Sequence, residues 1–277
     1  MKILTIDLGG TKTRLAQFRG AEVAAEVEFP TAADANACIA NISAAIRAEF
    51  ADFATFSDDN VVALATRGLI SPDGAVSDAR LDWHGLPIAK LLSEQLGDTR
   101  VLLGNDAKLG ALGAFPPDFR GRGLYLTIGT GIGGGLMLDG HLSSDLDAME
   151  VGKIQLRHDG AWQTWESFAS GYAFSTKYND FGENIPAGSP IWHDYAADLA
   201  AGIVALLPVL RPDKIVIGGG ISQLFDKFGE LLRQLVSDTA WQPAIPAEIS
   251  AAADARHTVN RGAAIFALNQ LKHDGQE

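Results

Sequence analysis

Clustered glycines are the residues of this sequence whose type and spacing point most clearly to a chemical role, and that role is phosphate binding. Glycines cluster at Gly9 and Gly10, at 129–135 and at 218–220. Apolar runs on both sides of the first two clusters predict strand hairpins, and the third cluster follows a predicted strand. Backbone amides that converge in such turns bind anions. The pattern therefore predicts three loops that clamp a nucleotide.

Side chains around the first turn add groups that suit a nucleotide. Thr11 supplies a hydroxyl donor and Lys12 a positive charge. Asp7 ends the preceding apolar run and is a candidate Mg²⁺ ligand, directly or through water, since Mg²⁺ usually keeps several of its waters. A hairpin turn that needs glycine only for its backbone conformation explains this segment equally well when it is taken alone.

The second glycine cluster also matches a dinucleotide-binding pattern, which we reject. Gly129, Gly131 and Gly134 fit G-x-G-x-x-G, and Glu150 follows at a plausible distance. That fingerprint requires a helix directly after the turn, with its N-terminus beneath the pyrophosphate. Residues 136–140 instead predict a strand and a turn. The sequence also lacks the G-x-x-x-x-G-K-[ST] pattern of P-loop proteins.

Composition and charge narrow the class of protein. The chain has 277 residues, 47% of them hydrophobic and 20% charged, which suits a globular protein of two domains. Its formal net charge of -12, with no basic stripe, argues against nucleic acid as a partner. The single cysteine, Cys38, allows no internal disulfide and no multi-cysteine zinc site, and the histidines show no metal-ligand spacing.

No segment predicts a secretory signal or a membrane span. Asp7 interrupts the short apolar run at the N-terminus. The most apolar long stretch, 196–210, contains Asp198 and Pro208 and is too short to cross a bilayer. We expect Asp198 on an exposed face of its helix. We therefore expect a soluble, cytoplasmic protein without a membrane partner, and a homo-oligomer is left open.

Hydrophobic periodicity predicts a mixed α/β chain. Strands are expected at 3–7, 13–18, 23–29, 61–65, 101–103, 124–128, 136–138 and 215–217. Helices are expected at 34–50, with Asp34 as N-cap, and at 87–96, 106–115, 165–178, 191–210, 224–236 and 261–271. Residues 67–85 are punctuated by glycine and proline and are predicted to be irregular. Because the glycine hairpin recurs, we predict two related α/β lobes with a cleft between them.

Six motifs, in order along nearly the whole chain, resemble those of the ROK sugar kinases, a branch of the actin/hexokinase superfamily. They are Asp7-Leu8-Gly9-Gly10-Thr11-Lys12, Asn105-Asp106-Ala107, Gly129-Thr130-Gly131-Ile132-Gly133-Gly134-Gly135, Glu150-Val151-Gly152, Glu166 with Ser170-Gly171, and Ile217-Gly218-Gly219-Gly220-Ile221-Ser222. Each motif is weak alone, and their shared order makes the resemblance specific.

The resemblance implies a fold, a domain division and an activity. The fold would be α/β, two-lobed and actin/hexokinase-like, with ribonuclease H-like repeats and a central cleft. Residues 1–105 would form a smaller N-terminal lobe, joined by a C-terminal helix at about 260–271, and residues 106–259 a larger C-terminal lobe. The activity would be transfer of a phosphoryl group from ATP, with Mg²⁺, to a hexose. The enzyme would be glucokinase-like and act at the 6-hydroxyl.

The resemblance also implies roles for individual residues. Asp106 would be the general base that takes the proton of the acceptor hydroxyl, although an aspartate there also suits a helix N-cap. Carboxylates suit a sugar because they accept hydrogen bonds from its hydroxyls. The sugar-binding residues would be Gly68, Asn105, Glu150, Lys153 and Glu166. The cofactor-binding residues would be Asp7, Gly9, Gly10, Thr11, Lys12, Thr130, Gly131, Gly133, Gly219 and Gly220.

Three departures from the family pattern concern the sugar side. Lys153 stands in place of the motif's histidine, and we expect it to pair with a carboxylate, with Glu150 the obvious partner, and to donate to a sugar hydroxyl. The stretch from Lys153 to Glu166 is short and holds no cysteine, so the family's structural zinc is not expected. Arg67 and Arg80 stand where many members have proline and asparagine. The identity of the sugar is therefore in doubt.

Other functions stay open on the sequence. A kinase for an amino or acylamino sugar would have the same phosphate loops. A polyphosphate-dependent kinase would be expected to show a basic groove, which the sequence does not suggest. A non-catalytic sensor would bind sugar and nucleotide without turnover, and Asp106 argues against it. Repressor members carry a DNA-binding segment ahead of the first motif, and here the motif stands at the start of the sequence.

Overall fold

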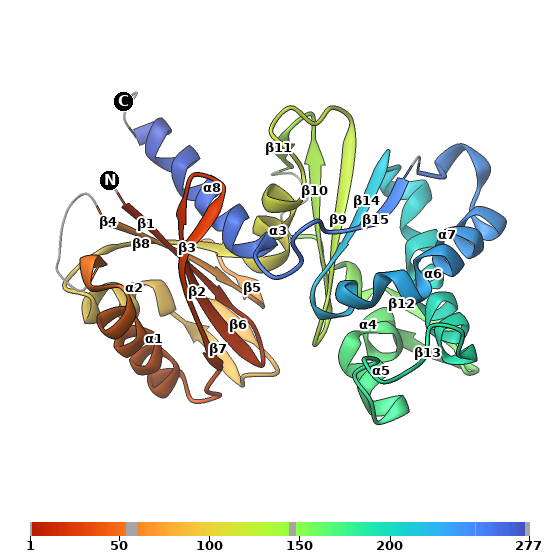
Figure 1. Cartoon of the computed structure of the whole chain (residues 1–277), viewed down its shortest axis with the longest axis horizontal. Coiled ribbons are helices and arrows are strands. Elements are labelled where there is room, and N and C mark those ends of the chain that lie inside the picture. Colours follow the sequence, from red (N-terminus) through yellow and green to blue (C-terminus); the bar gives the residue numbers. More distant parts are fainter. Residues whose placement is uncertain (1, 54–59, 144–147, 247, 275–277) are drawn as a thin grey trace. The chain divides into compact units, whose positions relative to one another are not determined.

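The computed structural model describes residues 2–53, 60–143, 148–246 and 248–274 (Figure 1). The chain divides into two compact units: Met1–Gly113 with Val259–Glu277 is unit 1, and Ala114–Thr258 is unit 2. The C-terminal segment therefore belongs with the N-terminal unit. The family resemblance implies a division between residues 105 and 106, whereas the contacts group the helix that follows, α3 (Asp106–Ala114), with unit 1 as far as Gly113.

Unit 1 contains a five-stranded sheet in the order β3-β2-β1-β4-β8. Its strands are β1 (Lys2–Leu8), β2 (Lys12–Arg19), β3 (Glu22–Pro30), β4 (Asn60–Thr66) and β8 (Arg100–Asn105). β1, β2 and β3 pair antiparallel, so the first predicted glycine hairpin is confirmed. β1, β4 and β8 pair in parallel, and their carboxyl ends meet at one edge of the sheet. Asp7, Thr66 and Asn105 stand at that edge.

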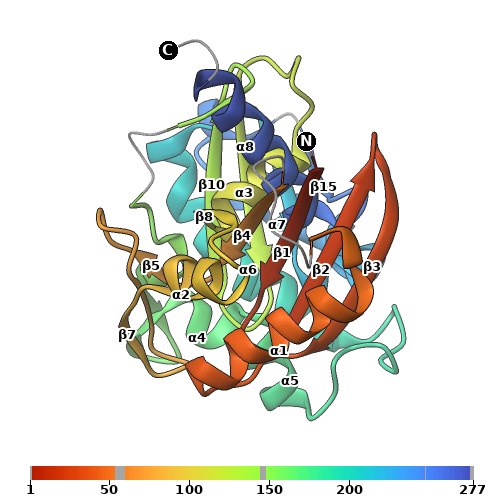
Figure 2. The ribbon, with the colours of Figure 1, turned by 90° about the vertical axis from the view of Figure 1, so that its left-hand side faces the viewer.

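Helices cover both faces of this sheet (Figures 1 and 2). They are α1 (Ala35–Glu49), α2 (Ile88–Gln95), α3 and α8 (Thr258–Asp274), and a short 3-10 helix, η1 (Ala51–Phe53), follows α1. Leu4, Ile6 and Leu8 of β1 belong to the buried cluster that includes the apolar side chains of α1 and α2. Thr5 points to the opposite face, where its hydroxyl accepts a hydrogen bond from Asn260 Nδ2 of α8 at 3.1 Å. The alternation of side chains along β1 thus accounts for both layers.

The segment predicted to be irregular, 67–85, instead includes a small three-stranded sheet. β5 (Leu69–Ile70), β6 (Val76–Asp78) and β7 (Trp83–Leu86) pair antiparallel in that order. The prediction was wrong because strands of two to four residues are too short to show an alternating pattern. Trp83 is buried and its Nε1 donates to the carbonyl of Ala33 at 2.8 Å, which anchors this sheet beside the start of α1.

Unit 2 contains a second five-stranded sheet, in the order β11-β10-β9-β14-β15. Its strands are β9 (Arg122–Ile128), β10 (Ile132–Leu138), β11 (His141–Leu142), β14 (Lys214–Gly218) and β15 (Glu248–Ala251). β9 and β10 pair antiparallel around the second glycine turn, as predicted. β9, β14 and β15 pair in parallel. The glycine segments that follow β9 and β14 therefore leave the sheet from neighbouring strand ends.

The helices of unit 2 are α4 (Trp165–Ala169), α5 (Gly171–Tyr178), α6 (Pro190–Leu210) and α7 (Phe225–Thr239), with the 3-10 helices η3 (Val151–Lys153), η4 (Gly220–Leu224) and η5 (Gln242–Ala244). The single helix predicted over 165–178 is two helices, because Ser170 is extended and its Oγ caps α5 by accepting from the N–H of Ala173 at 3.1 Å. Within the described ranges, α6 is the one helix long and apolar enough to cross a membrane, and half of its most apolar 18-residue stretch is buried inside the protein. Its apolar side chains pack in the core of unit 2.

A hairpin of β12 (Gln155–His158) and β13 (Ala161–Thr164) occupies the stretch where the resemblance pointed to a missing zinc loop. The ring of His158 stacks on Phe168 with centroids 4.0 Å apart, and its Nε2 lies 3.0 Å from Asp198 Oδ1 on α6. Lys177 Nζ lies 3.6 Å from the other carboxylate oxygen of Asp198. The exposed position expected for Asp198 is therefore wrong, because its carboxylate binds partners that are distant in sequence.

Candidate active site

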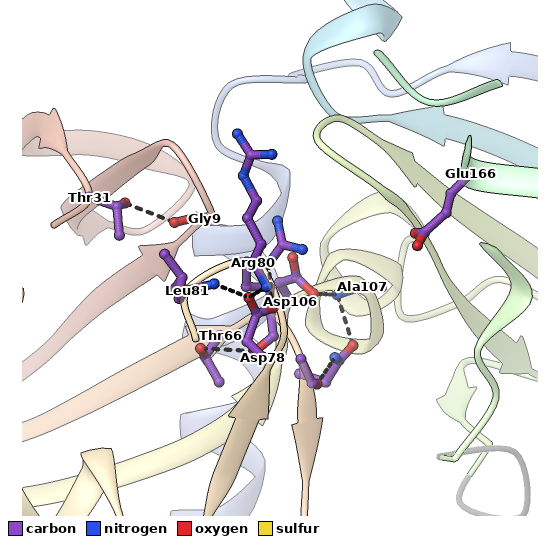
Figure 3. Close-up of polar contacts among 12 residues, drawn as sticks. Gly9, Thr31, Thr66, Asp78, Arg80, Leu81, Asp106, Ala107 and Glu166 are labelled. Carbon is purple, nitrogen blue, oxygen red and sulfur yellow. Dashed lines mark hydrogen bonds and ion pairs between the residues drawn. The ribbon is translucent and has the colours of Figure 1, made fainter. Parts of the chain in front are cut away.

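The first glycine turn joins β1 to β2 and is fixed by hydrogen bonds. The N–H of Gly9 donates to the carbonyl of Lys12 at 3.0 Å, and a Cβ on Gly9 would come within 2.9 Å of that oxygen. Thr31, just after β3, donates its hydroxyl to the Gly9 carbonyl at 2.8 Å (Figure 3) and its N–H to the Thr11 carbonyl at 3.0 Å. Thr31 therefore fixes the turn to the end of β3 by hydrogen bonds to two of its residues, Gly9 and Thr11.

The positive charge predicted for this turn is paired within the protein. Lys12 Nζ lies 2.9 Å from Oε1 of Glu28 on β3, and Arg14 pairs with Oε2 of the same carboxylate. Desolvation raises the pKa of Glu28, but the hydrogen bonds from Lys12 and Arg14 outweigh it and lower that pKa to about 2. The Lys12 side chain is 67% exposed, so its ammonium group remains accessible from solvent.

Two half-buried carboxylates interact at the carboxyl ends of β1 and β8. Desolvation, and then the negative charge of Asp106, raises the pKa of Asp7 to about 7, against the opposing charge of Arg14. Desolvation also raises the pKa of Asp106, opposed by the N–H of Ala107 and the charge of Arg67. Two carboxylates that resist joint ionisation favour a bound proton or a bound cation between them.

Asn105 caps the helix that starts at Asp106. Its Oδ1 accepts from the N–H groups of Ala107 and Lys108 at 3.1 and 3.2 Å, and its Nδ2 donates to the carbonyl of Gly68 at 3.1 Å. The cap of α3 therefore does not require Asp106, which weakens the capping interpretation of that aspartate. Asn105 itself, predicted to bind sugar, has both ends of its amide engaged by the protein.

Asp7 is the residue best suited to hold Mg²⁺. A carboxylate is the hard oxygen donor that Mg²⁺ prefers, and one or two suffice because the ion keeps several waters. Burial and then the charge of Asp106 raise the pKa of Asp7, and the charge of Arg14 only partly opposes them. Across 2–53, 60–143, 148–246 and 248–274, no group of three or more His, Cys, Asp and Glu side chains could hold a metal ion. A single carboxylate suits a Mg²⁺ ion whose other ligands are water and substrate, and this role of Asp7 stays a prediction.

Arg67 and Arg80, which depart from the family pattern, lie beside the same turn. Arg67 Nε donates to Asp78 Oδ2 at 2.6 Å, and Asp78 Oδ1 accepts from the N–H groups of Arg80 and Leu81 at 2.9 Å each (Figure 3). A Cβ on Gly10 would come within 2.4 Å of Nη1 of Arg67. The sequence marks Arg67 and Arg80 as departures from the family pattern, but it gives no sign of their link to Asp78, which depends on the short strands β5, β6 and β7.

In unit 2, the second and third glycine clusters lie against each other. The N–H of Gly129 donates to the carbonyl of Gly131 at 3.0 Å and closes the turn between β9 and β10. Gly219 has a φ of 77°, and a Cβ there would come within 2.4 Å of the carbonyl oxygen of Ile128, so only glycine allows this approach. The other predicted cofactor residues of unit 2 belong to the same segments: Thr130 in the turn, Gly133 in β10 and Gly220 at the start of η4.

Glu166, in the first turn of α4, reaches the second glycine turn. Its Oε2 accepts from the N–H of Ile132 at 3.3 Å, and a Cβ on Gly131 would come within 2.7 Å of that oxygen. Its Oε1 forms an ion pair with Lys153 Nζ. The carboxylate that pairs with Lys153 is thus Glu166, where the sequence suggested Glu150, the residue before η3.

The predicted site residues form two groups, one in each unit. Unit 1 holds the proposed base, the first phosphate turn and two sugar-binding candidates: Asp7, Gly9, Gly10, Thr11, Lys12, Gly68, Asn105 and Asp106. Unit 2 holds the second and third glycine clusters and three sugar-binding candidates: Thr130, Gly131, Gly133, Glu150, Lys153, Glu166, Gly219 and Gly220. The part that each residue plays toward a substrate stays a prediction.

Comparison with known proteins supports the resemblance over nearly the whole chain. The family model described as the ROK family matches residues 3–270. The bifunctional enzyme NanE/NanK of Brucella melitensis is 27% identical over 265 residues, 84% of this chain and 48% of that protein. Kanosamine kinase of Amycolatopsis mediterranei is 26% identical over 297 residues, 95% of each protein. The chain spans about half the length of several curated relatives that it matches.

A solved structure confirms the predicted fold. The ROK family glucokinase of Streptomyces griseus, determined in complex with glucose and AMPPNP, matches with a TM-score of 0.80 over 96% of this chain and 99% of that chain. At 20% identity this likeness shows the fold alone, the two-lobed actin/hexokinase-like α/β fold.

Proposed function

The chain belongs to the ROK family, and on that premise we propose that it is an ATP-dependent sugar kinase that phosphorylates a hexose at its 6-hydroxyl. The observation that carries the proposal is the position of Asp106. This carboxylate starts α3 at the edge where the parallel strands of unit 1 end, and it interacts with Asp7 beside the first glycine turn. Its helix is capped by Asn105, and Oδ1 of Asp106 accepts from the N–H of Ala107 at 2.8 Å, so Oδ2 is the oxygen proposed to take the proton.

Asp106 would act as the general base of the transfer. As the acceptor hydroxyl attacks the γ-phosphorus of ATP, its proton passes to Asp106, the bond from that phosphorus to the β,γ-bridging oxygen breaks, and ADP leaves. Desolvation makes Asp106 a stronger base than an exposed aspartate. Mg²⁺ would neutralise charge on the ATP phosphates, and Asp7 would hold it directly or through water.

The remaining candidates divide between nucleotide and sugar. The amides of the Gly9 and Gly131 turns, with the Gly219 segment, would bind the phosphates and adenosine of ATP. Glu166 would accept hydrogen bonds from sugar hydroxyls, and Lys153, paired with it, would donate to one. Sugar and ATP are therefore the proposed small-molecule partners of the chain.

An amino sugar is the second candidate for the acceptor. The alignment with kanosamine kinase covers 95% of each protein, whereas the alignment with NanE/NanK covers 84% of this chain and 48% of that protein. An amino sugar at neutral pH carries an ammonium group, which a carboxylate such as Glu150 would bind more tightly than it binds a hydroxyl.

An assay for ADP release tests both candidates. Purified protein would be supplied with MgATP and, one at a time, glucose, fructose, mannose, N-acetylmannosamine, N-acetylglucosamine and an amino sugar. We expect sugar-dependent ADP release, with an equal amount of sugar phosphate, for at least one neutral hexose. A response restricted to the amino sugar or to the two N-acetylated sugars would replace the neutral hexose by an amino or acylamino sugar. A folded protein that releases ADP with none of them would contradict the proposal.

A further inference from the structure

Two arginine side chains pack against the first glycine turn. A Cβ on Gly10 would come within 2.4 Å of Nη1 and 3.2 Å of Cζ of Arg67, and within 3.2 Å of Cδ of Arg80. The guanidinium of Arg67 therefore occupies the space that a side chain at residue 10 would fill. This turn is the one whose amides are expected to bind phosphate, so the arginine adds positive charge where phosphate oxygens would lie.

Asp78 fixes Arg67 in this position. Asp78 is 5% exposed, and its Oδ2 accepts from Nε of Arg67 at 2.6 Å. Its Oδ1 accepts from the N–H groups of Arg80 and Leu81, so the same carboxylate also shapes the loop that carries the second arginine. The bond to Asp78 uses the Nε edge of the guanidinium of Arg67, and Nη1 is the atom that lies over Gly10. An arginine fixed in this way loses little conformational freedom when it binds an anion.

Arg67 also lies close to the proposed base. The residue after Arg67, Gly68, accepts at its carbonyl a hydrogen bond from Nδ2 of Asn105, the residue before Asp106. The positive charge of Arg67 acts on the Asp106 carboxylate in the direction that favours its ionised form. Arg67 thus stands beside both the phosphate turn and the base, and all of these residues belong to unit 1.

We propose that Arg67 is a catalytic residue that binds the phosphoryl group while it is transferred, with Arg80 adding positive charge beside it and Asp78 positioning both. The proposal rests on the kinase activity proposed above. The transferring phosphoryl group carries negative charge on three oxygens, and a forked guanidinium matches that geometry. The charge beside the turn stabilises the group that moves from ATP toward the hydroxyl held by Asp106.

Steady-state kinetics of Arg67 variants test this. Arg67→Ala should lower kcat by about 10²–10³-fold, as loss of one charge-stabilising donor does, with less than about threefold change in KM for sugar or MgATP. Arg67→Lys, which keeps the charge and loses the fork, should recover part of the rate. Added guanidinium ion at millimolar concentration should partly rescue Arg67→Ala, which a merely structural role would not allow. Arg47→Ala, a change of the same size at an exposed site on α1, should leave kcat unchanged.

The Asp78→Asn variant, with thermal unfolding to check that each variant is folded, separates a positioning role from a folding role. Asp78→Asn should lower kcat less than Arg67→Ala and should not respond to guanidinium, because the cation is still present but less well oriented. If Arg67→Ala does not fold, Arg67→Lys and Asp78→Asn carry the test, and wild-type kcat in both would overturn the proposal. A higher KM for sugar at unchanged kcat would also overturn it, and would place an anionic group of the acceptor at Arg67. Absence of any sugar-dependent ADP release by the wild-type protein would instead refute the kinase activity itself.

Discussion

Substitution of Asp7 by asparagine should stabilise the ligand-free protein at alkaline pH while it removes activity. Asp7 is half-buried, and desolvation together with the charge of Asp106 raises its pKa from 3.8 to about 7. The folded protein therefore binds this proton more tightly than the unfolded chain does. The contribution of Asp7 to the free energy of unfolding is fully present below about pH 4 and is lost as pH rises through about 7. An asparagine has no such pH dependence.

The size of the effect follows from the shift in pKa. Each pKa unit corresponds to about 1.4 kcal/mol, so without solvent screening Asp7 would lower the free energy of unfolding by about 4 kcal/mol at about pH 8, relative to acid pH. At about pH 5, where the folded protein keeps the proton and the unfolded chain loses it, the loss would be about 1.6 kcal/mol. Because Asp7 keeps some exposure, we expect the stabilisation by Asp7→Asn to grow by about 2 kcal/mol between those two pH values. The same variant should lose Mg²⁺-dependent activity, since it lacks the proposed metal ligand.

Urea unfolding of the protein without ligands and with chelator, at both pH values, measures this difference. Asp118→Asn is the matched control, because Asp118 is exposed in the loop between α3 and β9 and should show no comparable growth with pH. A stabilisation by Asp7→Asn that is the same at both pH values would refute the reasoning. Loss of stability at alkaline pH would refute it more strongly, because it would mean that ionised Asp7 is stabilised by its surroundings.

Three further outcomes are expected. Lys153→Ala should raise KM for sugar by about tenfold with little change in KM for ATP, because Lys153 pairs with Glu166, a proposed sugar-binding residue. An unchanged KM for every accepted sugar would mean that Lys153 has no role in sugar binding. His158→Ala should lower the free energy of unfolding by about 1–3 kcal/mol with little change in kcat, because it removes the stacking on Phe168 and the bond to Asp198 that hold the β12–β13 hairpin. A loss of activity without a loss of stability would contradict this explanation. Metal analysis should find no stoichiometric zinc, and activity in excess EDTA should return on addition of Mg²⁺, whereas full activity in EDTA alone would remove Mg²⁺ from the account.

Local signals in the sequence were sufficient to predict the two glycine hairpins and several helix ends. Both glycine hairpins form as expected, because apolar runs on each side of a short glycine turn leave few other pairings. Asp34 caps α1, with its Oδ1 2.7 Å from the N–H of Ala37, because a cap depends on residues three positions apart. Ser170, by contrast, ends α4 and caps α5 at a place where helical periodicity continues across it.

Contacts between distant residues explain what the sequence did not predict. Asp198 lies on an apolar helix, and its partner His158 is 40 residues away in the sequence. Helical periodicity therefore gave no reason to place the Asp198 carboxylate inside unit 2. The bond between Arg67 and Asp78 depends on a three-stranded sheet whose strands are too short to detect. The raised pKa of Asp7 results first from burial and then from the charge of Asp106, and only the sheet order, with β1 and β8 on either side of β4, shows that these two carboxylates are near each other.

Turnover by Asp106→Asn, measured with a sugar that the wild-type protein accepts, tests the central claim most directly. The asparagine keeps the size of the side chain and cannot take the proton. We expect kcat to fall by about 10²–10⁴-fold, the usual contribution of a general base, while calorimetry shows that sugar and ATP still bind. Wild-type turnover by the folded variant would contradict the role of Asp106 and with it the mechanism derived from this site.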